Sequence, residues 1–282
     1  MKPKMIIKYI LIIILACIGL YYMNHLQHYI IEKYLYKETV NTIIPRYVWQ
    51  TYKTKDLPSR VSSLRDGWID KNPGWKNILY DDADIERYMK ENWDNRMYVF
   101  YKALPLGVMK ADLWRYLVLN THGGVYSDID SKCIIPINYW FHDFAGPNAL
   151  VIGLENDVHF CQWTMYTTKD HPALNHVCNF ILEKYEKDGI DIKNPHFVHA
   201  TTGPAIWTNA LKSYLDLEHL SNARNIYEMY TKDKSYFVNK GVYILSEDYF
   251  NTIYTSNLYG SVFFGDGYVK WTDEANKLRS TV

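Results

Sequence analysis

The sequence lacks the features that identify several common protein classes. Its 282 residues include only four cysteines, none in a Cys-x-x-Cys spacing, which excludes a disulfide scaffold and a zinc ribbon. Lys plus Arg and Asp plus Glu both number 31, so no excess positive charge exists to hold nucleic acid, and we expect no nucleic-acid partner. A Gly-x-x-x-x-Gly-Lys phosphate loop, a Gly-x-Ser-x-Gly turn and a dinucleotide-binding glycine fingerprint are also absent.

Charge is missing from one long segment near the N-terminus. Residues 9–23 contain no charged side chain. Counting back to residue 5 gives an apolar stretch of roughly 19 residues that only Lys8 interrupts, and a helix of that length spans about 28 Å, close to the hydrocarbon core of a bilayer. We therefore expect residues 1–23 to be a cytosolic tip and transmembrane signal-anchor, residues 24–42 a stem, and residues 43–282 one folded domain.

The flanks of this segment predict its orientation. Lys2 and Lys4 precede it, while Tyr21 and Tyr22 at its end suit a membrane interface. The positive-inside rule then predicts a single-pass type II membrane protein whose folded domain lies in the lumen of the secretory pathway, in the Golgi or ER. A cleaved signal peptide is the alternative, and it would have a shorter apolar region that ends in small residues.

The folded domain begins with alternating strand and helix patterns. Branched and aromatic residues at 43–51 and 75–80 predict two strands, while 59–71 and 84–92 have helical spacing and charge. The Asn-Pro-Gly sequence at 72–74 ends the first helix. This alternation predicts an α/β fold with a parallel sheet covered by helices.

The next segment places two aspartates at the end of a strand. Apolar residues recur at helical spacing from residue 106, a Gly123-Gly124 stop follows, and residues 125–127 begin a strand that leads into Asp128 and Asp130. Alternate residues of an extended strand share a face, so we expect these carboxylates to point the same way. Ligands bind at the carboxyl ends of strands in open α/β sheets, which makes this position a candidate site.

Two neighbouring carboxylates repel each other unless a cation or hydrogen-bond donors lie between them. Mg²⁺ or Mn²⁺ accepts one or two carboxylates together with substrate phosphates and water. Such a site would neutralise the charge that develops on a departing nucleoside diphosphate. A solvated turn is the alternative for an isolated Asp-x-Asp sequence.

A second carboxylate in the preceding helix strengthens the metal interpretation. Asp112 lies in an apolar helical segment with Arg115 one turn later, where the two can pair. The alternative is an ion pair on the helix surface without a function. Because the glycines allow a tight passage from helix to strand, we expect Asp112, Arg115, Asp128 and Asp130 to converge on one pocket.

These residues carry a resemblance to a known family. The segment from Ala111-Asp112-Leu113-Trp114-Arg115-Tyr116 through Gly123-Gly124-Val125-Tyr126-Ser127-Asp128-Ile129-Asp130 resembles the DXD sugar-binding region of glycosyltransferase family 32. That family includes yeast α-1,6-mannosyltransferases of the Och1 type, inositol-phosphoceramide mannosyltransferases and bacterial capsular glycosyltransferases. The resemblance extends to Ile44–Tyr52, to Asn72–Asp82 and to Thr202-Gly203-Pro204, and so covers about residues 43 to 210.

The resemblance implies a fold, a cofactor and roles for individual residues. The fold would be of the GT-A type, a single Rossmann-like α/β sandwich behind the N-terminal transmembrane helix, with a retaining mechanism that requires Mn²⁺ or Mg²⁺. By this resemblance, Val48, Gln50 and Thr51 would bind the nucleotide, and Asp112 and Arg115 would bind the donor sugar and its phosphates. Asp128 would contact the ribose and sugar, or the metal through water, and Asp130 would bind the metal directly. Gly203 and Pro204 would shape the sugar or acceptor side of the cleft.

The sequence departs from the family pattern at two places. Trp49 replaces the histidine of the first strand, so any contact that the imidazole makes with base or phosphate is lost or altered. The C-terminal His-x-x-x-Gly-Ser-Trp is reduced to Gly260-Ser261, which leaves Ser261 as a candidate metal ligand and Trp271 as a source of the missing ring.

Other candidates stand outside the family motifs. Glu155 and Asp157 follow an apolar run, where they lie either at another strand end facing an acceptor or in a solvated loop. Cys133, Cys161 and Cys178 lie outside the apolar N-terminal segment, so at least one of the three stays free. No pattern identifies a general base, which would leave the departing phosphate to take the proton of the acceptor.

The sequence therefore predicts a membrane-anchored hexosyltransferase. Its donor would be GDP-mannose or a UDP-sugar, its acceptor a glycan or glycolipid hydroxyl, and its catalytic residues Asp112, Arg115 and Asp130. Two alternatives remain at this point: a metal-dependent phosphotransferase that uses the same carboxylates, and a non-catalytic protein that binds glycans or nucleotide-sugars.

Overall fold

The computed structural model describes residues 44–140, 148–230, 237–258 and 270–282. The expected anchor at 1–23, the expected stem at 24–42 and the candidate ligand Ser261 lie outside these ranges. Within the described ranges, none of the helices combines the length and apolar character needed to cross a bilayer.

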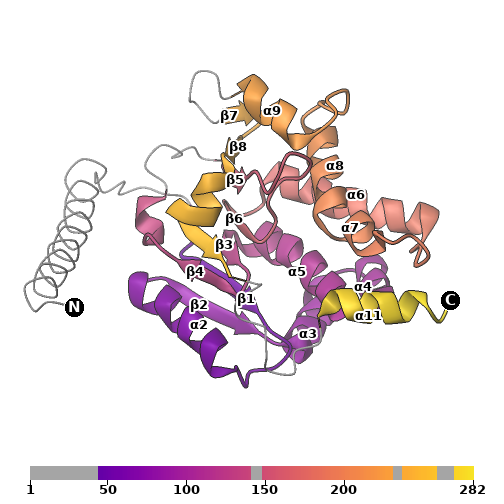
Figure 1. Ribbon diagram of the computed structural model, residues 1–282, viewed down its shortest axis with the longest axis horizontal. Coiled ribbons are helices and arrows are strands. Elements are labelled where there is room, and N and C mark those ends of the chain that lie inside the picture. Colours follow the sequence, from indigo (N-terminus) through magenta and orange to yellow (C-terminus); the bar gives the residue numbers. More distant parts are fainter. Residues whose placement is uncertain (1–43, 141–147, 231–236, 259–269) are drawn as a thin grey trace, which may run out of the picture.

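A mixed seven-stranded sheet forms the centre of the fold (Figure 1). Its strands, in spatial order, are β2 (Lys76–Tyr80), β1 (Tyr47–Thr51), β3 (Gly124–Ser127), β6 (Thr164–Thr167), β5 (Leu150–Gly153), β8 (Val242–Leu245) and β7 (Phe237–Asn239). A separate two-stranded sheet pairs β4 (Ser131–Cys133) with β9 (Thr255–Asn257).

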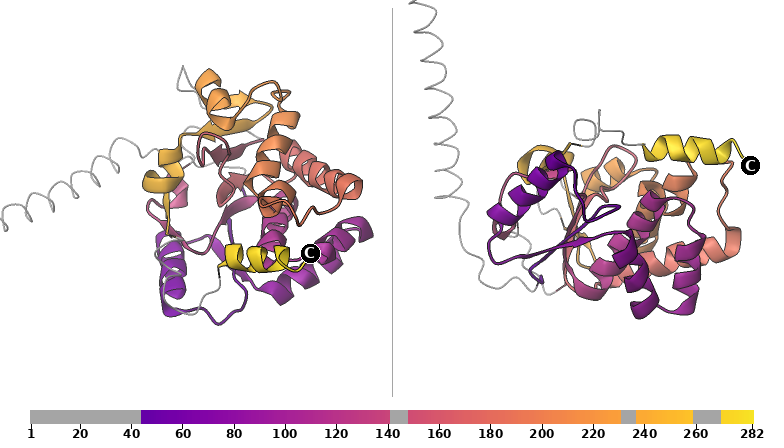
Figure 2. Two further views of the ribbon diagram at one scale, coloured as in Figure 1. Left: turned by 45° about the vertical axis from the view of Figure 1, so that its right-hand side comes forward. Right: turned by 90° about the horizontal axis from the view of Figure 1, so that it is seen from below.

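Helices cover both faces of the central sheet. The larger core contains helices α3 (Asp82–Asn92), α4 (Asn95–Ala103), α5 (Gly107–His122), α6 (Pro172–Asp188), α7 (Phe197–Thr201), α8 (Pro204–Tyr214), α9 (Ala223–Tyr230) and α11 (Trp271–Arg279). The opposite face carries α2 (Ser59–Lys71) and the short helices η1 (Ile137–Tyr139) and η2 (Tyr249–Ile253). Figures 1 and 2 show α2, in purple, across the sheet from α5 and α6.

The alternation of side chains along the strands produces two separate cores. Trp49 and Tyr126 point into the larger core, whereas their neighbours Val48 and Val125 point into the core beneath α2. Successive strand residues face opposite sides of a sheet, so a sheet that is covered on both faces needs apolar side chains at every position. β5 (Leu150–Gly153) meets that need throughout, whereas β1, β3 and β6 also bury the polar residues Gln50, Ser127, Thr164 and Thr167.

The predicted α/β architecture is confirmed, and one part of it is wrong. The helix expected at 59–71 is α2, and the strands around it, β1 and β2, are parallel to each other, as are β1 and β3. However, β6 runs antiparallel to both β3 and β5, so the sheet is not parallel throughout. Residues 154–163 join β5 to β6 without a helix, and a short connection between neighbouring strands returns the chain in the opposite direction.

The junction between α5 and β3 is built from two glycines with positive φ. Gly123 has φ 66° and Gly124 has φ 98°, a region that residues with side chains rarely adopt. A Cβ on Gly123 would lie 2.6 Å from the backbone nitrogen of Lys169, and one on Gly124 would lie 2.7 Å from the carbonyl oxygen of Tyr47. Only glycine therefore allows the three chain segments to meet here.

Candidate active site

A cleft of about 610 Å³ opens where β1, β3 and β5 end. Its walls include the last residue of β1 with the two that follow it, the Asp128–Asp130 segment after β3, and Glu155 after β5. Helix α5 lines one side, and residues before α8 and in α11 line another. This position, at the carboxyl ends of parallel strands, is the one expected for a ligand site in an α/β sheet.

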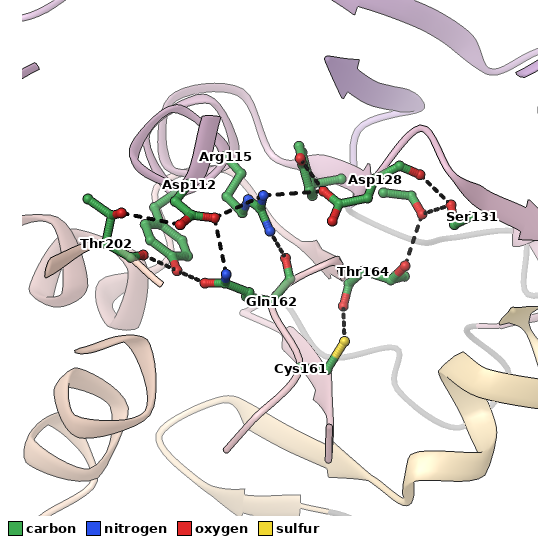
Figure 3. Close-up of polar contacts among 11 residues, drawn as sticks. Asp112, Arg115, Asp128, Ser131, Cys161, Gln162, Thr164 and Thr202 are labelled. Carbon is green, nitrogen blue, oxygen red and sulfur yellow. Dashed lines mark hydrogen bonds and ion pairs between the residues drawn. The ribbon is translucent and has the colours of Figure 1, made fainter. Parts of the chain in front are cut away.

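Arg115 is the centre of a buried polar network in this cleft (Figure 3). Its Nη2 lies 3.0 Å from Asp112 Oδ1 and 3.3 Å from Asp128 Oδ1, and its Nη1 donates a hydrogen bond of 3.1 Å to the carbonyl oxygen of Gln162. The guanidinium also lies over the ring of Tyr126, 4.7 Å from its centroid. One cation thus joins the carboxylate of helix α5 to the first carboxylate of the DXD segment.

Asp112 has a partner on each of its oxygens. Besides Arg115, the Gln162 amide donates a hydrogen bond of 3.1 Å to Oδ1, and the Thr202 hydroxyl donates one of 3.2 Å to Oδ2. Asp112 is only 2% exposed, and this burial raises its pKa to about 6, while Arg115 opposes that rise. The ion pair with Arg115 and the hydrogen bonds from Gln162 and Thr202 favour the ionised form of Asp112.

The charge of Arg115 is equally fixed. Burial by itself lowers the pKa of this guanidinium, but Asp128, Tyr126 and Asp112 outweigh that effect and hold the pKa above its ordinary value. A permanently charged group at this place can bind phosphate oxygens of a substrate. The convergence of Asp112, Arg115 and Asp128 that the motif order predicts is present in the structure.

The DXD segment is a turn and not the extended strand that we expected. β3 ends at Ser127, and the backbone N–H of Ser131 donates a hydrogen bond of 3.1 Å to the carbonyl oxygen of Asp128, which closes a turn over the two aspartates. The Ser127 hydroxyl lies 2.7 Å from that of Ser131 and 2.9 Å from that of Thr164, so side chains on both sides fix the turn. Asp128 and Asp130 nevertheless both line the cleft.

The two aspartates of this turn differ in their surroundings. Asp128 accepts a hydrogen bond of 2.6 Å from the Tyr126 hydroxyl and pairs with Arg115, whereas Asp130 has no ion-pair partner among the described residues. Asp130 is 5% exposed, and its burial together with the charge of Asp128 raises its pKa to about 7. In the described part of the chain, no group of three or more His, Cys, Asp or Glu side chains could hold a metal ion.

The structure distributes the candidate nucleotide-binding residues of β1 between the cleft and the core. Thr51 lines the cleft with Tyr52 and Lys53. Val48 is fully buried in the core beneath α2, and the buried amide of Gln50 has no hydrogen-bond partner among the described residues. Because neighbouring strand residues face opposite sides, the four residues 48–51 do not share one surface.

Trp49 has a structural role where the family pattern has histidine. Its indole N–H donates a hydrogen bond of 2.8 Å to the carbonyl oxygen of Gly123, and its ring contacts Trp114 and Tyr80 within the core. The side chain at this position therefore supports the junction between α5 and β3. It is absent from the walls of the cleft.

The Thr-Gly-Pro element lies beside the Arg115 network. Pro204 lines the cleft at the start of α8, and Thr202 donates its hydroxyl to Asp112. Gly203 has no room for a side chain, since a Cβ would lie 2.8 Å from His199 Cα. Trp271 of α11 also lines the cleft and contacts the ring of His199, 5.8 Å between centroids.

Sequence reasoning missed some residues of this site. It gave no role to Gln162 or Thr202, which reach Asp112 across 50 and 90 residues of sequence. The Thr-Gly-Pro match was a signal for Thr202, whereas Gln162 had none. Of the pair Glu155 and Asp157, only Glu155 lines the cleft, while Asp157 is exposed and pairs with Arg224 at 2.9 Å.

The three cysteines of the described ranges take no part in a disulfide. Cys133, Cys161 and Cys178 are all free and buried, which fits small apolar side chains of the interior better than reactive thiols. Burial raises the pKa of Cys133 to about 11.

Comparisons with known proteins agree with this geometry. Residues 58–145, which contain Asp112, Arg115, Asp128 and Asp130, match the family model "Glycosyltransferase sugar-binding region containing DXD motif". The chain is 31% identical over 235 residues to an initiation-specific alpha-1,6-mannosyltransferase of Schizosaccharomyces pombe, a match that covers 73% of this chain and 59% of that protein. It is 36% identical over 137 residues to inositol phosphoceramide mannosyltransferase 1 of the same organism, covering 46% and 40%.

The chain thus spans only about half the length of the curated relatives that it matches. Among solved structures, a PaToxG glycosyltransferase aligns with 61% of this chain and 70% of its own at 18% identity, with a TM-score of 0.49. The resemblance that the motifs predicted is confirmed by the family match and by the named relatives. The chain carries the glycosyltransferase sugar-binding region that contains the DXD motif and is similar to α-1,6-mannosyltransferases and inositol phosphoceramide mannosyltransferases.

Proposed function

We propose that this chain is a metal-dependent glycosyltransferase. It transfers a hexose, mannose in the first instance, from GDP-mannose or a UDP-sugar to a hydroxyl of a glycan or glycolipid, with retention of anomeric configuration. The observation that carries the proposal is the position of Asp128 and Asp130 beside Arg115 in one cleft. The mannosyltransferases among its relatives support mannose as the sugar.

The residues of the cleft suit a hard divalent ion. Asp128 and Asp130 supply two carboxylates, and Mg²⁺ or Mn²⁺ is commonly held by one or two carboxylates while donor phosphates and water complete the coordination. A bound ion would neutralise the charge that develops on the departing diphosphate. The burial of Asp130 beside another carboxylate is costly without a cation, which also supports this assignment.

The remaining residues bind and orient the donor. Arg115 presents a fixed positive charge to the diphosphate, and Asp112 holds the guanidinium in place while facing the sugar. Thr51 and Pro204 both line the cleft, and we assign Thr51 to the nucleotide and Pro204 to the sugar or the acceptor. Groups that are fixed before the substrate arrives lower the barrier because they need no rearrangement during the reaction.

The proposal extends to the organisation of the whole chain. We assign the domain at 43–282 to the GT-A type, with 1–23 as a transmembrane signal-anchor and 24–42 as a stem. The domain would then face the lumen of the Golgi or ER, where glycan and glycolipid acceptors are presented. Protection of a tag at Val282 from protease in intact vesicles tests this orientation.

A panel of donors tests the activity. The full-length chain is incubated with GDP- and UDP-sugars, with and without Mn²⁺, and the release of free nucleoside diphosphate is measured. We expect Mn²⁺-dependent release from one donor that is lost in Asp130→Ala and kept in Asp157→Asn, an exposed carboxylate outside the cleft. Metal-independent donor binding without turnover would indicate a binding protein, and transfer of phosphate to an acceptor would indicate a phosphotransferase.

A further inference from the structure

The wall of the cleft that carries Trp271 has no role in the proposed donor site. Trp271 begins helix α11, is half-buried and lines the cleft, and Glu274 lines it one turn later on the same helix. The indole contacts the ring of His199 in α7, with 5.8 Å between centroids, and His199 also lines the cleft. An indole, an imidazole and a carboxylate are therefore available to a second ligand beside the donor.

Two contacts place this wall at the β5 side of the site. The ring of His199 lies 6.2 Å, between centroids, from that of His159, which belongs to the loop that joins β5 to β6. A Cβ on Gly203 would lie 2.8 Å from His199 Cα, so α7 packs closely against the Thr-Gly-Pro element, whose Thr202 donates to Asp112. The wall thus borders the part of the cleft that we assign to the donor sugar.

The order of the strands separates this wall from the nucleotide side. β1 and β3 are neighbours in the sheet, while β6 lies between β3 and β5. We assign Thr51, at the end of β1, to the nucleotide, and Asp128 and Asp130, after β3, to the metal and the diphosphate. A donor bound in this order has its sugar on the side of β3 that faces β6 and β5. The wall with His199 and Trp271 then follows the sugar, where an acceptor has to approach.

The side chains of this wall suit a sugar. An indole offers a flat apolar surface, and the C–H face of a pyranose can cover such a surface while its hydroxyls stay at the edge. An ionised Glu274 accepts hydrogen bonds from hydroxyls, and a neutral His199 both donates and accepts. Burial, together with His196, lowers the pKa of His199, which favours the neutral ring. Trp271 packs against the larger core and against His199, so the indole is held before an acceptor arrives.

The charges of the cleft favour a neutral acceptor over a phosphorylated one. Among the described residues that line the cleft, the Lys and Arg side chains are Lys53, which follows β1, and Arg115, which is paired with two carboxylates. The lining residues of α7, α8 and α11 include the carboxylate of Glu274 and no Lys or Arg, and Lys270 before Trp271 is absent from the walls. A phosphate at this wall would meet a like charge without a cation to bind it.

We propose that Trp271, His199 and Glu274 form the acceptor subsite and that this subsite binds a neutral pyranose of a glycan, an inference that rests on the proposed function. The sugar ring packs against the indole, and its hydroxyls form hydrogen bonds with the imidazole and the carboxylate. These residues select and position the acceptor, while the diphosphate and the metal are bound elsewhere in the cleft. The phosphorylated headgroup of an inositol lipid is the acceptor that the subsite disfavours.

The test measures transfer by the full-length chain to a neutral and to an anionic probe. Methyl α-D-mannopyranoside and myo-inositol 1-phosphate are supplied with Mn²⁺ and the donor that the panel identifies, and hydrolysis of the donor by water is measured in parallel. We expect the wild-type kcat/KM for the mannoside to exceed that for the inositol phosphate by about tenfold or more. Trp271→Ala should lower kcat/KM for the mannoside about tenfold more than it lowers donor hydrolysis, chiefly through KM.

Three further variants separate acceptor binding from folding. Trp271→Phe retains an aromatic ring and should keep kcat/KM for the mannoside within about threefold of wild type. Thr272→Ala removes an exposed side chain of the same helix that does not line the cleft, and it should match the wild type. Glu274→Lys changes an exposed position, and at low ionic strength it should shift the preference between the probes toward the inositol phosphate by about fivefold.

Different results would overturn the inference and the function beneath it. Equal losses of transfer and of donor hydrolysis in Trp271→Ala would assign the indole to the donor or to the fold and overturn the acceptor subsite. Wild-type transfer in Trp271→Ala, a better reaction with the inositol phosphate than with the mannoside, or donor hydrolysis that neither probe diverts would overturn it as well. If the wild type releases nucleoside diphosphate from no donor, the proposed function fails and the inference falls with it.

Discussion

Asp112 and Asp130 are almost equally buried, at 2% and 5% exposed, yet the partners of their side chains differ. Asp112 has partners on both oxygens, from Arg115, Gln162 and Thr202, which come from three separate segments. Asp130 is held through its backbone, whose carbonyl accepts from Leu258 at 3.0 Å, and it has no ion-pair partner among the described residues.

The difference indicates two kinds of buried carboxylate in one cleft. A carboxylate with a complete set of partners contributes to the fold and holds its neighbours in position. A carboxylate that is buried beside another negative charge, without an ion-pair partner, raises the free energy of the folded state until a cation binds. The contrast predicts that mutation of the two residues will separate stability from activity.

The largest effect on stability is expected for Asp112→Ala. This change leaves Arg115 with one carboxylate fewer and leaves Gln162 and Thr202 without their acceptor, so the free energy of unfolding should fall by about 3–5 kcal/mol. Chemical denaturation measures the loss, with Asp157→Ala as the exposed control. A loss below about 1 kcal/mol would show that Asp112 is not the structural member of the pair.

Asp130→Asn should show the reverse pattern. Because burial raises the pKa of Asp130, its ionised form destabilises the folded protein, and the neutral amide should leave the melting temperature unchanged or higher at pH 8. Mn²⁺-dependent donor turnover should fall by about 100-fold or more. An unstable Asp130→Asn protein would remove the distinction between the two carboxylates.

The open carboxylate also predicts how metal binding depends on pH. The metal must displace a proton from Asp130, whose pKa is about 7, so Mn²⁺ affinity should weaken by about tenfold for each pH unit below that value. Calorimetric titration between pH 5 and 8 measures the slope. In Asp130→Asn the slope should disappear, and a slope that persists would assign the titrating group elsewhere.

The smallest predicted effect concerns one hydrogen bond to Asp112. Thr202→Val keeps the shape of the side chain but removes the donor to Oδ2, which should cost about 1–2 kcal/mol of stability. Loss of this hydrogen bond should also raise the pKa of Asp112 further, because the hydrogen bond from Thr202 lowers that pKa. An unchanged unfolding free energy would mean that water or another group replaces the threonine.

The elements that the sequence predicted best depend on local signals. The helix at 59–71 has the bounds of α2 because helical spacing and the Asn-Pro-Gly stop are both local. The direction of β6 was not predictable in the same way, because it depends on the length of the connection from β5 and on which strands become neighbours. Strand patterns specify which residues are buried, and they leave the direction of pairing open.

The site shows the same limit at the level of side chains. The order of motifs brought Asp112, Arg115 and Asp128 together because helix, glycine stop and strand follow each other in the chain. The turn at Asp128 replaces the extended strand that was expected there. The Ser127 hydroxyl before this turn lies within hydrogen-bond distance of the hydroxyls of Ser131 and Thr164, which are outside strand β3. The spacing of residues within one segment does not predict which residues of a distant segment that segment will contact.

The glycine junction between α5 and β3 has a consequence for the spacing of the site. Arg115 precedes the junction and Asp128 follows it, and their contact at 3.3 Å depends on the chain length between them. One residue added to the helix would rotate Arg115 by about 100°, and one added to the strand would turn Asp128 to the other face. Since Gly123 and Gly124 are packed against neighbouring backbone, the junction has no room for an inserted residue. The interval from Arg115 to Asp128 is therefore a fixed length, and an altered interval in a distant relative would indicate that this site is lost even if every site residue is retained.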